Sequence, residues 1–308
     1  MVRLVAALLL PLAVPLIITA LIWMLPGDPA SIICPPEACG GTGALAERWN
    51  LDRGPVHFFT SWFGGALSGD FGNSWRLQQG VSVAELLGAA IPSTLALIAL
   101  SMILVMAGAL SGATGWIHQR FDPILQVVGV VPALVLSLIA AASVELALGS
   151  DSFGDSGTFW RLFAGALVLG LADGAFAGAV TGVRGIFQRE NAQRYVGIAL
   201  LRGETRLSNT LLSVAPAMVG QLRARALHLL SGAVVVEVVL RIDGLGDLLW
   251  RGTLLQDFGV VRAAATGFAV VSAALLLVQA GLEVLVAVQT RRTPVVPTDR
   301  LPLVGGAT

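Results

Sequence analysis

Some ionisable side chains lie inside long apolar stretches of this sequence, where a charge needs a specific reason to be present. They are Asp173, Arg223, Arg225, His228 and Glu237. A charge at the centre of a bilayer costs at least about 2.5 kcal/mol, so such groups usually face a bundle interior or a water-filled cavity. A water-filled path between the fourth and fifth spans could use them to meet a zwitterionic or charged solute, and the pathway candidates among them are Asp173, Arg223, Arg225 and Glu237, with Asp173 the most central.

A simpler interpretation exists for most of these groups. Arg223 and Arg225 could lie near the inner membrane boundary and extend to water, and Glu237 could lie near the outer one. His228 could be a core residue with a satisfied hydrogen bond. Asp173 lies too deep for this interpretation, so we expect it to take part in transport or to pair with an arginine.

The sequence lacks the motifs of common membrane-embedded enzymes. It has no His-Glu-x-x-His zinc pair and no Gly-x-Ser-x-Gly nucleophile turn. Asp243 and Asp247 could suggest a metal site, but Gly244 and Gly246 beside them favour a turn or gate. No lysine is present, so no ATP-binding P-loop can form. We expect no catalytic residue, metal or cofactor in this chain, with an enzyme or a non-transporting scaffold as alternatives.

Cys34 and Cys39 lie close together and flank a short Pro-Pro-Glu run. If this loop is extracytoplasmic, the oxidising exterior permits a disulfide between them. Metal capture is less favoured, because His57 is the only histidine in the same loop. A disulfide or two free thiols are the remaining interpretations.

The elements that must position these residues are membrane helices. Hydrophobic residues make up 56% of the chain and charged residues 12%, about half the charge of a typical soluble domain. Several runs reach the roughly 20 residues that span a bilayer, and helices are the form that satisfies their backbone groups there. We expect an all-α integral membrane protein with about six transmembrane helices. The expected spans are Leu4–Leu25, Ile91–Ile117, Ile124–Val144, Leu162–Val183, Pro216–Leu240 and Ala263–Leu282.

These spans divide the chain into a first helix at 1–25, a polar outer loop at 26–90, a five-helix core at 91–290 and a tail at 291–308. Most arginines fall inside when the loop at 26–90 is placed outside, as the positive-inside rule requires. Both termini are then cytoplasmic. The net charge is zero, which gives no sign of a nucleic-acid partner.

The inner segment 184–213 alternates charged and apolar residues. Tyr195, Ile198 and Ala199 share one face at helical spacing. A short amphipathic helix on the cytoplasmic side could either dock a partner protein or lie on the membrane surface.

Several motifs occur in an order typical of one transporter family. They are Leu25-Pro26-Gly27-Asp28-Pro29, Leu51-Asp52-Arg53, Gly69-Asp70-Phe71-Gly72, Ile91-Pro92-Ser93-Thr94-Leu95, Arg184-Gly185 with Tyr195-Val196, Ala199 and Arg202-Gly203, and Glu237 with Gly244-Leu245-Gly246 and Asp257. Together they resemble the permease family of dipeptide, oligopeptide and nickel ABC importers over nearly the whole chain. The coupling loop departs from the family at Leu200 and Leu201, where one basic residue is lost.

The resemblance implies that segment 184–213 holds a coupling helix between the fourth and fifth spans, pressed into a groove of an ATPase subunit. The implied coupling residues are Arg184, Tyr195, Val196, Ala199, Arg202 and Gly203. Further candidates for the pathway or gate are Gly244, Gly246 and Asp257, besides the ionisable groups above.

The resemblance also implies a second homologous permease, two ATPase subunits that bind ATP and Mg, and an extracytoplasmic solute-binding protein. The expected location is the bacterial inner membrane, and the expected solutes are dipeptides or oligopeptides. Nickel or another small solute is the alternative.

Overall fold

The computed structural model describes residues 2–25, 30–31, 43–48, 51–149, 155–203 and 205–292. Its described residues are helical almost throughout, and their only β interaction is an isolated bridge between Asn73 and Ser82. The helices are α1 (Val2–Met24), α4 (Gly43–Arg48), α5 (Gly54–Leu67), α6 (Val83–Thr114), η1 (Gln119–Phe121), α7 (Asp122–Val130), α8 (Ala133–Leu148), α9 (Asp155–Leu171), η3 (Ala172–Gly174), α10 (Ala175–Asn191), α11 (Arg194–Leu201), α12 (Arg206–Leu240), α13 (Leu245–Leu254) and α14 (Phe258–Arg292). The prediction of an all-α membrane protein is confirmed.

Four helical stretches of the described chain are long and apolar enough to cross a membrane. They are Ala7–Met24, Val83–Thr114, Ser156–Asn191 and Phe258–Val286. The bent pair α7–α8 would make a fifth span. The expected span Pro216–Leu240 lies within the 35-residue helix α12, which is not among these stretches and carries Arg223, Arg225 and Glu237. Six crossings and the orientation of the termini therefore stay predictions.

The expected span Ile124–Val144 is not one straight helix. α7 ends at Val130, α8 begins at Ala133, and the two axes differ by 85°. Pro132 causes the break because it lacks an N–H donor and disfavours the helical conformation at Val131, whose φ and ψ are −69° and 123°.

The expected span Leu162–Val183 is also interrupted. Asp173 has φ of 51° and Gly174 has φ of 71°, which place both residues in the left-handed region between α9 and α10. Glycine adopts this region freely and aspartate tolerates it better than most residues do. The Asp-Gly pair was therefore a turn signal inside an apolar run that the sequence analysis did not use.

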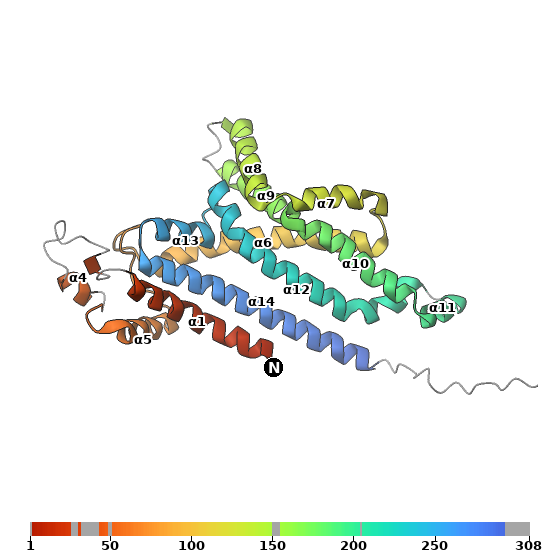
Figure 1. Ribbon diagram of the computed structural model, residues 1–308, viewed down its shortest axis with the longest axis horizontal. Helices are drawn as coiled ribbons and strands as arrows, with labels where there is room; N and C mark the ends of the chain where they lie inside the picture. The colour runs from red at the N-terminus through yellow and green to blue at the C-terminus, as the bar shows by residue number, and fades with distance from the viewer. Residues whose placement is uncertain are drawn as a thin grey trace, which may run out of the picture.

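The main core packs α6, α9, α10 and α12 together, with fully buried residues such as Leu97, Val105, Leu229 and Val236. α1 packs along α14. At one end of the long axis lie α4 and α5 of the expected outer loop, and α11 of the expected coupling segment lies at the opposite end (Figure 1). Two smaller apolar clusters join α5 to its neighbours, centred on Trp62 and on Phe58.

Candidate transport path and coupling helix

α11 lies in the segment expected to contact an ATPase, and it presents two different faces. Val196 and Ala199 are buried, while Tyr195, Ile198 and Leu201 are exposed, Leu201 to 89%. The helix packs on α12 and α10 of its own chain. Val196 and Ala199 therefore hold α11 in place, and its exposed apolar surface is formed by Tyr195, Ile198 and Leu201 together with Leu200, which is 36% exposed.

Hydrogen bonds at both ends fix α11 relative to its neighbours. The Tyr195 hydroxyl lies 2.6 Å from Glu190 Oε1 and 3.2 Å from Ser213 Oγ, so it joins α10 to α12. The pKa of Tyr195 is raised mainly by its partial burial and to a smaller extent by its hydrogen bond to Glu190. After the exposed Arg202, Gly203 has φ of 83° and its N–H donates to Leu200 O, as is typical where a helix ends.

Arg184, another expected coupling residue, lies inside α10 and is only 7% exposed. Its Nη1 lies 2.7 Å from both carboxylate oxygens of Asp122, and its Nη2 donates to Ile117 O at 2.7 Å. Arg184 thus ties α10 to the connection between α6 and α7. The Arg184 side chain is 9% exposed in this pair, and the Asp122 side chain is 27% exposed.

The break at Asp173 is held by a residue of another helix. Arg225 of α12 donates from Nη1 to Gly174 O at 3.2 Å. Its guanidinium lies against Gly178, where any side chain would collide with it. Arg225 thereby ties α12 to Gly174, the N-cap residue of α10. Asp173 itself is exposed.

Glu237, Gly244 and Gly246 meet at the turn between α12 and α13. Glu237 is fully buried, and its Oε2 accepts the Gly246 N–H at 2.6 Å. A Cβ at Gly244 would collide with the Glu237 carboxylate, and one at Gly246 would lie 2.6 Å from Val234 Cα. The carboxylate occupies the start of α13, where the helix dipole favours negative charge. This contact explains why the turn needs glycine at both positions.

Two further contacts position α13. The Leu245 N–H donates to Thr94 Oγ1 of α6 at 2.8 Å. On the outer face of α13, Arg251 forms ion pairs with Asp243 at 3.1 Å and Asp247 at 2.5 Å. Burial raises the pKa of Asp247, while Arg251 acts in the opposite direction. Asp243 and Asp247 both pair with Arg251, so they form an ion-pair network.

The described residues contain no group of three or more His, Cys, Asp or Glu side chains that could hold a metal ion.

Asp257 joins the outer segment to the start of α14. Its Oδ2 accepts the Ser74 hydroxyl at 2.6 Å and the backbone N–H groups of Trp75, Arg76 and Leu77 at 2.9, 2.9 and 3.1 Å. Its Oδ1 accepts the Val260 N–H. A fully buried carboxylate bound by this many donors anchors a loop firmly.

Arg262 is a buried cation that the sequence analysis did not single out. It is 3% exposed, and its guanidinium carbon lies 4.3 Å from the ring centroids of both Phe58 and Trp62. Such stacking over two rings stabilises a cation away from water. Phe58 and Trp62 are four residues apart, which places both rings on one face of α5, and this spacing was the only sequence pattern that indicated a site for a cation.

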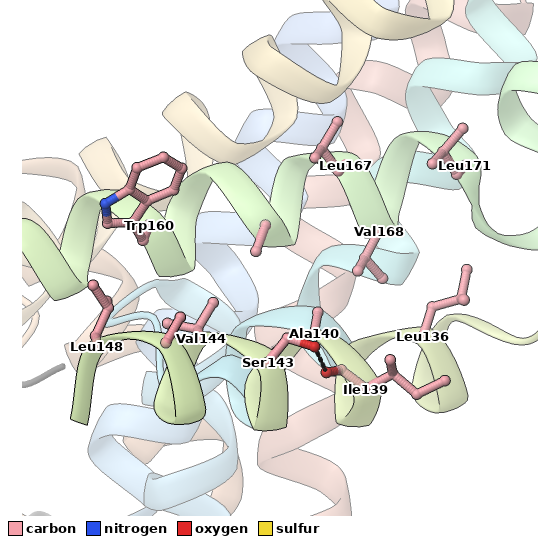
Figure 2. A pocket seen from close by; sticks show the side chains of 12 residues that line it. Leu136, Ile139, Ala140, Ser143, Val144, Leu148, Trp160, Leu167, Val168 and Leu171 are labelled. Atoms are coloured by element: carbon pink, nitrogen blue, oxygen red, sulfur yellow. Dashed lines mark hydrogen bonds between the residues drawn. The ribbon is translucent and has the colours of Figure 1, made fainter.

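An apolar pocket of about 540 Å³ lies between α8 and α9. Figure 2 shows Leu136 and Leu171 towards one end and Leu148 and Trp160 towards the other. Its one hydroxyl, that of Ser143, donates to Ile139 O at 2.8 Å and is therefore occupied. The lining offers no charged group, so this pocket cannot recognise a charged solute.

Some expected site residues cannot be placed. Cys34, Cys39 and the side chain of Arg223 lie outside the described residues. His228 is half-buried on α12. Of the candidates that the structure does place, Asp173 and Arg225 meet at one break, while Glu237, Gly244 and Gly246 meet at another turn. Asp257 lies apart from both groups.

Comparison with known proteins finds permeases among the relatives of this chain. The "Glutathione transport system permease protein GsiC" of Escherichia coli (strain K12) is 29% identical over 269 residues, which cover 81% of this chain and 84% of that protein. The protein of the same name from Shigella boydii serotype 4 (strain Sb227) matches to the same extent. No family model matches the sequence. The resemblance inferred from the motifs is thus confirmed by permeases that match over most of their length.

Proposed function

We propose that this chain, a homologue of ABC importer permeases, is the transmembrane subunit of an ATP-driven importer that passes peptide-like solutes inward. The proposal is supported by relatives whose name assigns them to glutathione transport, because glutathione is itself a small peptide. The relatives match over most of their length, so the similarity extends well beyond a single motif.

The single observation that carries the coupling role is the exposed apolar face of α11. Tyr195, Ile198 and Leu201 present this face at the opposite end of the molecule from α5 (Figure 1). The chain lacks a P-loop lysine, so the energy of ATP must enter through other subunits. An exposed apolar patch on a short helix is the form in which one protein docks into a groove of another.

The contacts of α11 supply a route by which movement of an ATPase would reach the membrane helices. Tyr195 bonds to both α10 and α12, and Arg184 bonds α10 to the connection before α7. A displacement of α11 therefore moves α10, α12 and α7 together. These are the helices that surround the break at Asp173, so closure of the ATPase pair would change the geometry there.

The proposed assembly contains a second homologous permease, two ATPase subunits that bind ATP and Mg, and an extracytoplasmic solute-binding protein. Its proposed place is the bacterial inner membrane, with both termini of this chain in the cytoplasm. The outer segment anchored by Asp257 would face the binding protein.

Co-purification of the tagged permease with its neighbouring ATPase tests the proposal. Ile198→Asp and Leu201→Asp place a charge on the docking face and should lower the retained ATPase about tenfold or more, because buried apolar anchors dominate such interfaces. Leu67→Asp, at a residue of α5 that is 76% exposed, is the matched control and should retain the ATPase. ATP hydrolysis stimulated by the loaded binding protein should fall in parallel. Equal retention in all three variants, or no stimulated hydrolysis by the wild-type assembly, would contradict the proposal.

A further inference from the structure

Two interrupted helices meet in the middle of this molecule. The break between α7 and α8 lies against η3, the break between α9 and α10. The Asp173 N–H donates to Val131 O at 3.4 Å, so each break supplies a hydrogen-bonding group to the other. A Cβ at Gly129 would lie 2.9 Å from Gly174 Cα, which shows how closely the two backbones approach.

Arg225 of α12 contacts the backbone on the α10 side of this paired break. Its bond to Gly174 O and its contact with Gly178 hold the guanidinium between α10 and α12. Its Nε is buried and has no hydrogen-bond partner within the described part of the chain. Non-helical backbone at membrane depth is tolerated only where it is buried in protein or lines a water-filled cavity. One side of the break is buried by Arg225, and Asp173 is on the exposed side.

The position of Asp173 requires compensation for its charge. The residue lies near the middle of the candidate span Ser156–Asn191 and is exposed in this chain. No salt bridge involving Asp173 is formed among the residues that the structure describes. A carboxylate in this place cannot face lipid tails without a cost of at least about 70-fold in an equilibrium constant. Water or a cationic ligand must therefore reach it.

We propose that Asp173, presented at the paired break between α7–α8 and α9–α10, binds the ammonium group of the solute during its passage. Arg225 is a positioning residue that caps the break and keeps Asp173 turned outward. The inference rests on the proposed function, because it takes the chain to be an importer permease. It adds the chemical class of the solute group that this chain itself recognises: a primary ammonium, as at the amino terminus of a peptide.

Charged thiol reagents can measure, without knowledge of the solute, whether water reaches the break and whether its electrostatic potential favours cations. The experiment uses the full assembly in vesicles, with Cys34 and Cys39 changed to Ser and with Val130→Cys as the reporter. Val130 is 79% exposed and adjoins the carbonyl that binds Asp173. The reporter thiol is treated with a cationic reagent, trimethylammonium-ethyl methanethiosulfonate, or with an anionic one, sulfonato-ethyl methanethiosulfonate. The ratio of the cationic to the anionic reaction rate is then compared between the protein with Asp173 and the Asp173→Asn variant.

The ratio of cationic to anionic reaction rates should fall at least about fivefold in Asp173→Asn, because a unit negative charge is removed from a residue whose backbone is hydrogen-bonded to Val131, next to the reporter. Asp173→Glu should retain the ratio. Leu167→Cys, which lines the apolar pocket on α9, should react slowly with both reagents in either background.

Three results would overturn the inference. The ratio could be unchanged by Asp173→Asn, or Val130→Cys could react as slowly as Leu167→Cys. Alternatively, Asp173→Asn could release the second permease during purification, which would show that a cation of that subunit pairs with Asp173. Labelling does not depend on transport, whereas stimulated ATP hydrolysis tests the importer role separately, so the two failures are distinguishable.

Discussion

The end of the molecule that holds α13 and the break between α9 and α10 place their acidic residues in opposite environments. Glu237 and Asp257 are fully buried, and backbone N–H groups bind their carboxylates. Asp173 is exposed and forms none of the salt bridges found in the described chain. Both residues belong to motifs that resemble the family, yet the chain encloses their carboxylates. Asp257 accepts five hydrogen bonds, whereas Glu237 accepts one at Oε2 and its Oε1 is buried without a partner in the described part of the chain. The difference teaches that a carboxylate is available to a solute only where the fold leaves it accessible.

The largest effect should come from removing the Asp257 carboxylate. Asp257→Ala leaves the Ser74 hydroxyl and the N–H groups of Trp75, Arg76 and Leu77 without their acceptor. Each unsatisfied buried donor costs about 1–3 kcal/mol, so the free energy of unfolding in detergent should fall by about 3 kcal/mol or more. Chemical denaturation followed by fluorescence would measure it.

Asp243→Ala is the matched control, because it removes the same side chain at the same end of the molecule. Its ion pair with Arg251 is largely exposed, so the expected loss is below about 1 kcal/mol. Equal losses in the two variants would mean that Asp257 is no stronger an anchor than a surface acid.

A smaller loss in the free energy of unfolding is expected from Gly244→Ala, at the turn that contains the Glu237 carboxylate. The Cβ of Gly244→Ala would collide with the buried carboxylate, and overpacking of this kind costs about 1–3 kcal/mol. Gly185→Ala in α10 is the control, because its Cβ would meet nothing within 4 Å. Alanine favours a helix over glycine, so that variant should be neutral or slightly more stable. A harmless Gly244→Ala would show that the turn can move away from Glu237.

The smallest effect on stability should come from Asp173→Asn. The residue is exposed, and asparagine tolerates its left-handed backbone conformation as well as aspartate does. The free energy of unfolding should therefore change by less than about 0.5 kcal/mol. A loss above about 1 kcal/mol in the same denaturation experiment would reveal a stabilising partner of Asp173 and would contradict its contrast with Glu237 and Asp257.

Sequence reasoning predicted the helical membrane architecture and a short amphipathic helix within 184–213, where α11 lies, because hydropathy and helical spacing are local properties. It also grouped Glu237 with Gly244 and Gly246, although as gate candidates, before their contact was visible. It missed the 85° break at Pro132, which lies inside a charge-free run that hydropathy treats as uniform. It also expected Val196 and Ala199 to contact a partner, but the fold buries both residues within this chain.

Composition and periodicity by themselves determined that this protein is built of membrane-crossing helices, since bilayer thickness and backbone hydrogen bonding leave few alternatives. The order of the motifs determined the family resemblance. Only the tertiary structure decided which ionisable groups are already bound. Arg184 finds Asp122 and Asp257 finds the backbone near Ser74 across long separations in the chain. Such pairs depend on how helices pack, and no local pattern in a sequence encodes which polar groups packing brings together.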